Sequence, residues 1–110
     1  MQALSGAMTA RSQRAIASYL RDAAPEQTRG MDEAGLLVFV ARSEARGRAL
    51  GLKTERGLGR FAYLTLISRG EIWNVSPALD NLRNAADGPD KAIARLLAAI
   101  GERMLQRGAA

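Results

Sequence analysis

The side chains that could do chemistry in this sequence are a small set of carboxylates, because the chain has no histidine and no cysteine. Neighbouring acids, such as Asp87 and Asp90, could bind a metal ion or exchange protons. Four acids fall instead in the first turns of expected helices, where they stabilise the helix dipole: Asp32, Glu33, Glu55 and Asp90. Zinc sites of cysteine and histidine, and Cys–His nucleophile pairs, are excluded. We therefore predict no catalytic residue, no metal site and no cofactor, in a protein that is not an enzyme.

Arginine dominates the basic residues, which number 16 against 11 acids and give a net charge of +5. Arg42 with Arg46, and Arg56 with Arg60, are four residues apart, so each pair shares a helix face. Arginine binds carboxylates and phosphates through two parallel hydrogen bonds. A helix that reads bases also carries Asn, Gln or Ser among its arginines, and few occur here. The pairs therefore indicate a solvated face first, an acidic protein partner second and nucleic acid last.

Two further features lie near these arginines in the sequence. Trp73 follows Gly70 in an expected loop, and a tryptophan there is equally typical of a core residue and of an interface anchor. The segment Gly57-x-Gly59 is not a phosphate loop, because no strand precedes it and no Gly-Lys-Ser/Thr follows. It is more typical of close helix packing. The residues that we predict to bind a protein are Arg42, Arg46, Arg60 and Trp73.

The elements that must position these residues are expected to be helices. Hydrophobic residues make up 47% of the chain but aromatic residues only 5%, which suits packed helices better than a β-sandwich. Capping residues, glycines and apolar stripes predict five helices, at about 9–24, 31–50, 54–70, 76–86 and 88–108. We predict an all-α fold, a compact bundle of these helices. Residues 9–108 would form one helical domain after a flexible N-terminus at 1–8.

One segment admits a second interpretation. The apolar run that begins at Phe61, the turn-like Ser68-Arg69-Gly70-Glu71 and the following residues to Val75 could form a β-hairpin at 61–75. The fold would then be α+β. Short apolar runs cannot be assigned by periodicity alone, and the pattern favours the helix over the hairpin.

The order of several short motifs resembles that of a known group of proteins. The motifs are Leu20-Arg21 with Pro25, Ala49-Leu50-Gly51-Leu52, Thr54-Glu55, Arg60-Phe61 with Leu64, and Gly70-x-x-Trp73. Together they are similar to small accessory proteins encoded in bacterial type VI secretion effector loci. The resemblance implies an all-helical co-chaperone that stabilises a secretion effector, or helps to load it or its adaptor.

Three functions remain open at this stage. The resemblance implies a non-enzymatic accessory whose partner is a secretion effector or its adaptor. The positive charge suggests a small nucleic-acid-binding regulator, and an arginine-rich surface could also serve an immunity protein that neutralises a neighbouring toxin. The N-terminal residues lack the pattern of a signal peptide, and the longest apolar run, 36–41, is too short to span a membrane. We expect a cytoplasmic protein with a protein partner, no specific nucleic acid and no membrane, whose oligomeric state the sequence does not predict.

Overall fold

Side chains at the helix starts explain where the central helices begin. In the computed structural model, which describes residues 10–74 and 76–109, Asp32 precedes helix α3 (Glu33–Ala49) and accepts a hydrogen bond from the Gly35 N–H at 2.7 Å. Thr54 caps helix α4 (Glu55–Ser68) in the same way, through the Gly57 N–H at 2.9 Å. Both caps satisfy a backbone donor that has no partner within its helix. The predicted flexible segment 1–8 lies outside the described residues.

Most described residues lie in helices, which short turns connect. Four further helices accompany α3 and α4, in addition to the 3₁₀ helix η2 (Glu71–Asn74): α1 (Ala10–Ala23), α2 (Pro25–Thr28), α5 (Ser76–Arg83) and α6 (Pro89–Ala109). The predicted all-α fold is confirmed, and the five predicted helices correspond to α1, α3, α4, α5 and α6. The short α2 and η2 occupy segments that the sequence assigned to connections.

The alternative hairpin at 61–75 is wrong, since no described residue is in a strand. The apolar run from Phe61 continues α4 to Ser68. Arg69 and Gly70 then both take left-handed backbone angles, with φ of 54° and 80°, and the Gly70 N–H donates to the Thr65 carbonyl at 2.8 Å. This helix-ending geometry turns the chain directly into η2, so no second strand can pair with 61–67.

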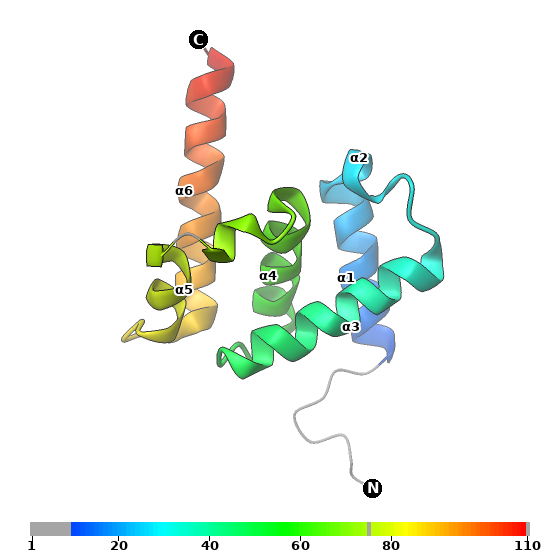
Figure 1. The fold of residues 1–110 in the computed structure, drawn as a ribbon, viewed down its shortest axis with the longest axis horizontal. Coiled ribbons are helices and arrows are strands. Elements are labelled where there is room, and N and C mark those ends of the chain that lie inside the picture. Colours follow the sequence, from blue (N-terminus) through cyan, green and yellow to red (C-terminus); the bar gives the residue numbers. More distant parts are fainter. Residues whose placement is uncertain (1–9, 75, 110) are drawn as a thin grey trace, which may run out of the picture.

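Helix α4 lies at the centre of the molecule. Figure 1 shows it between α1 and α6, with α3 lying across α1 and ending beside the start of α4. Helix α5 packs on α6, and η2 connects α4 to α5. The 21 residues of α6 make it about 31 Å long at 1.5 Å per residue, and its C-terminal part extends past the other helices (Figure 1).

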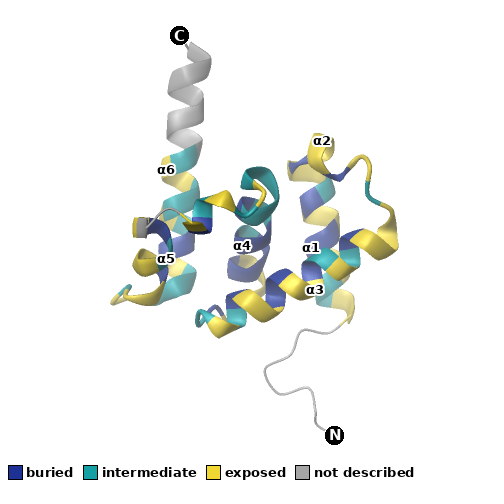
Figure 2. Ribbon diagram, in the orientation of Figure 1, coloured by how far each residue is buried: buried dark blue, intermediate teal, exposed yellow. Residues whose placement is uncertain are grey.

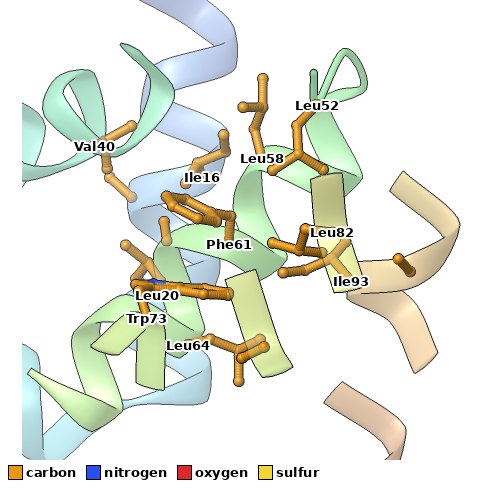
Figure 3. Packing of buried hydrophobic residues seen from close by; sticks show 14 of the residues in the cluster. Ile16, Leu20, Val40, Leu52, Leu58, Phe61, Leu64, Trp73, Leu82 and Ile93 are labelled. Atoms are coloured by element: carbon orange, nitrogen blue, oxygen red, sulfur yellow. The ribbon is translucent and has the colours of Figure 1, made fainter. Parts of the chain in front are cut away.

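The core forms where these helices meet, and Trp73 is part of it. Figure 3 shows the ring of Trp73 facing that of Phe61, and the two ring centroids are 4.7 Å apart with an interplanar angle of 20°. Trp73 is only 4% exposed, and its Nε1–H donates to Thr65 Oγ1 at 2.8 Å. Of the two roles that the sequence left open for Trp73, the structure supports the core residue.

Gly47 lets α3 approach α4 closely. A methyl group at Gly47 would lie 2.8 Å from Leu58 Cδ2 and 3.2 Å from Leu52 Cδ1, and both leucines are almost completely buried. Gly51, with φ of 99°, reverses the chain after α3, and the Leu52 N–H then donates to the Gly47 carbonyl at 2.9 Å. These residues fix the position of α4, and therefore of its outward-facing arginines.

Candidate protein-binding groove

The predicted site residues do not gather in one place. Arg42 and Arg46 lie on α3 and are exposed, and Figure 2 shows much of that helix as exposed surface. Arg60 lies half-buried on α4, where it lines a groove to which neither Arg42 nor Arg46 contributes. Trp73 lies in the core. Of the four residues, Arg60 alone therefore lines a depression that a partner could fill.

This depression is a groove over α4, with α1 and α6 as its walls. Its volume is about 390 Å³, within the range of ligand-binding clefts. Its lining residues come from all three helices: Ala15, Ile16 and Tyr19 of α1, Glu55, Arg56, Gly59 and Arg60 of α4, and Leu97 of α6. We call these eight residues the α4 groove. The groove combines an apolar surface with three charged side chains.

Gly59 is the smallest residue of the α4 groove, and helix packing does not require it. A methyl group there would lie 3.7 Å from both Ile16 Cγ1 and Tyr19 Cδ2, which is ordinary van der Waals contact. At Gly47 and Gly57, by contrast, a methyl group would overlap Leu58 or the carboxylate of Asp90. Glycine inside a helix costs about 1 kcal/mol relative to alanine. Gly59 is buried beneath Ile16 and Tyr19, with room between them for a methyl group.

Tyr19 supplies the aromatic surface of the groove. It is 37% exposed, and among the described residues only Val38 is a comparably exposed large hydrophobic side chain. Its ring centroid lies 6.0 Å from that of Tyr63 at an angle of 52°. Burial and the nearby Tyr63 raise the pKa of Tyr19, whereas the positive charge of Arg60 lowers it. Arg60 and Tyr19 therefore lie close enough in the groove for the charge of Arg60 to affect the Tyr19 hydroxyl.

The two arginines of the groove, Arg56 and Arg60, have no hydrogen-bond or ion-pair partner among the described residues. Like charges four residues apart on a helix repel each other. Glu55 lines the same groove but forms no ion pair with either arginine. Three other arginines are used within the fold: Arg21 donates to the carbonyls of Thr28 and Met31, Arg48 pairs with Glu44, and Arg95 pairs with Asp87. The charge of the groove is therefore available to a partner.

Asp90 fixes the α6 wall of the groove. Its carboxylate accepts hydrogen bonds from the Lys53 N–H at 3.1 Å, the Thr54 N–H at 3.2 Å and the Thr54 hydroxyl at 2.6 Å. The sequence assigned Asp90 only to the first turn of α6. The structure shows that it also ties α6 to the start of α4, which holds Leu97 beside the groove.

A larger cavity, of about 490 Å³, lies between α5 and α6. Its lining is mostly alanine and asparagine, and the only charged side chain in that lining, Arg95, already binds both carboxylate oxygens of Asp87. A partner would have to break this pair to use the charge. The α4 groove therefore offers the better binding chemistry.

The chain matches no known family, no curated protein sequence and no solved structure. Within residues 10–74 and 76–109, acidic side chains form no group of three that could hold a metal ion. None of the helices in that part of the chain has the length and apolar character needed to cross a bilayer. The α4 groove is thus the feature on which a functional proposal can be built.

Sequence reasoning placed four residues of this groove elsewhere. The sequence indicates a packing role for Gly59, and Tyr19 and Leu97 fall within the expected helices at 9–24 and 88–108 with no separate role. Arg56 was recognised only as the neighbour of Arg60 on one helix face. No local pattern indicates that α1, α4 and α6 meet, because that depends on long-range packing.

Proposed function

We propose that this protein is a non-enzymatic accessory that binds a partner protein through the α4 groove. The observation that carries the proposal is that Arg56 and Arg60, beside the exposed ring of Tyr19, have no hydrogen-bond or ion-pair partner in the described part of the chain. Arginine and tyrosine are enriched among the residues that dominate binding energy at protein interfaces. A partner carboxylate would also relieve the repulsion between the two guanidinium groups.

The resemblance of the sequence to accessory proteins of type VI secretion effector loci suggests the class of partner. We propose a secretion effector or its loading adaptor, bound in the cytoplasm before export. The absence of cysteine is compatible with that compartment. The role would be to stabilise the partner or to help load it.

Charge reversal at single arginines tests this proposal. Arg60→Glu should weaken capture of the partner from native lysate by at least about 2 kcal/mol, or about 30-fold in Kd, because it places a like charge opposite the partner's acid. Arg46→Glu on α3 makes the same charge change outside the groove, and is the matched control. If both variants capture the partner as well as wild type does, the groove is not the binding site.

A nucleic-acid partner is the competing hypothesis, since the net charge is +5. Glu55 lines the same groove and would repel a phosphate backbone. We therefore expect only weak binding to duplex DNA that is lost near physiological salt. Tight, sequence-dependent retention of DNA at that salt would favour the regulator instead.

A further inference from the structure

The turn between α5 and α6 contains the one place in the sequence where an aspartate or asparagine precedes a glycine, Asp87-Gly88. We infer that Asp87 is a site of isoaspartate formation, and that its ion pair with Arg95 slows this modification and so preserves the position of α6. The inference concerns the chain itself and is independent of the proposed partner binding.

The modification needs only the backbone and water. The Gly88 nitrogen attacks Cγ of the protonated Asp87 carboxyl group. An N–Cγ bond forms, a Cγ–O bond breaks, and the amide proton leaves with the hydroxyl group as water. A second water molecule then opens the succinimide ring. Opening at Cγ restores aspartate, whereas opening at the backbone carbonyl carbon gives isoaspartate, in which the main chain runs through the former side chain.

The turn leaves the Asp87–Gly88 bond at an open surface. Glycine lets other groups approach its nitrogen closely because it has no side chain. Gly88 has a φ of 96°, and a methyl group built on it would lie more than 4 Å from every described atom beyond its chain neighbours. Asp87 itself is exposed. Packing therefore does not shield this bond from the reaction.

Two contacts oppose the reaction in the folded protein. Arg95 Nη1 and Nη2 donate to the two carboxylate oxygens of Asp87 at 2.5 Å and 3.1 Å, so the carboxylate is held in one orientation. The hydrogen bond from Arg95 lowers the pKa of Asp87, and the charge of Lys91 adds to this effect, so less of the reactive protonated acid is present. The attacking nitrogen is also held, because the Gly88 N–H donates to the Ala85 carbonyl at 3.1 Å.

Isoaspartate at position 87 would disturb the start of α6. It adds one CH₂ group to the main chain and removes the side chain that Arg95 binds. Three residues later, Asp90 accepts hydrogen bonds from the N–H groups of Lys53 and Thr54 at 3.1 Å and 3.2 Å. A displaced turn moves Asp90 away from these donors. The modification therefore loosens the contact between α6 and the start of α4.

Ageing of the full chain at neutral pH tests the protection by Arg95. Wild type, Arg95→Gln and Arg83→Gln are first shown by circular dichroism to be equally helical, and isoaspartate at position 87 is then followed by peptide mass spectrometry. An exposed ion pair changes an equilibrium by up to about fivefold, so Arg95→Gln should form isoaspartate about two to five times faster than wild type. Arg83 is exposed on α5 and forms no hydrogen bond or ion pair with Asp87. Arg83→Gln is therefore the matched control and should age as wild type does.

A thermal comparison tests the effect on α6. The isoaspartate form, separated by reversed-phase chromatography and refolded, should have a lower Tm than the unmodified protein. Because the loss acts through Asp90, modification should lower the Tm of Asp90→Ala by less than it lowers the Tm of wild type. A modification that only disturbed the turn would lower both by the same amount.

Each part of the inference can fail separately. If Arg95→Gln and wild type age at the same rate, the ion pair does not protect Asp87. If wild type denatured in guanidinium forms no more isoaspartate at Asp87 than at the other aspartates, Asp87 is not the site. An unchanged Tm of the modified protein would refute the effect on α6. None of these results depends on partner binding.

Discussion

Replacing Gly59 with alanine is predicted to stabilise the protein. The substitution gains about 0.8–1 kcal/mol of helix propensity inside α4. Its methyl group would contact Ile16 and Tyr19 at 3.7 Å without overlap. These contacts add a few tenths of a kcal/mol of stability, less than the roughly 0.8 kcal/mol of a fully buried CH₂ group. A net gain of about 1 kcal/mol corresponds to a rise in Tm of about 4–6 °C for a domain of this size, measurable by circular dichroism.

Gly47→Ala is the matched control, because it makes the same change in a helix of the same fold. The propensity gain is equal, but the methyl group would lie 2.8 Å from Leu58 Cδ2 in a packed core. Overpacking costs about 1–3 kcal/mol, so the Tm should be unchanged or lower. If Gly59→Ala also lowers the Tm, Ile16 and Tyr19 leave no room for a methyl group at position 59 in solution.

Further variants test contacts of Trp73, Asp90 and Tyr19. Trp73→Ala should destabilise the fold by about 3–5 kcal/mol in chemical denaturation, because it removes the ring stacked on Phe61, whereas Trp73→Phe should lose much less. Asp90→Ala should cost about 1–2 kcal/mol, since Thr54 and Lys53 lose their acceptor, and a Tm equal to wild type would refute that role. The pKa of Tyr19 is raised above its usual 10.0, so its contribution to stability should be complete below about pH 10 and be lost as the pH rises through the folded-state pKa. Arg60→Gln should raise that pKa further in ultraviolet titration of a Tyr63→Phe background, because Arg60 lowers it in the wild type.

Local chemistry made most of the fold predictable. Caps such as Thr54 and the glycine at position 51 act through neighbouring backbone groups, so the sequence reveals them directly. A glycine within an apolar helix stripe, such as Gly47, also indicates a close approach of two helices. The short helices α2 and η2 were not predicted, since four residues give too little periodicity to distinguish them from a turn.

The candidate site was less predictable. Arg42, Arg46 and Arg60 are close in sequence, but the turn at Gly51 puts them on two different helices. The local pattern also could not distinguish a buried from an exposed Trp73. Its hydrogen bond to Thr65 and its stacking on Phe61 form only because the chain reverses at Gly70. The groove itself joins residues from 15 to 97, a separation that no local pattern spans.

Because α4 packs against α1 and α3 on one side and against η2 and α6 on the other, and α5 packs on η2 and α6, each set of helices can detach from it separately. Amide hydrogens of α4 should therefore exchange with solvent only on global unfolding. Those of α5 and α6 can exchange through a local unfolding that costs less free energy. A segment bound in the α4 groove touches α1 and α6 at once and would suppress that opening. Occupancy could then be followed as slower exchange in α6, with no change in the shape of the protein.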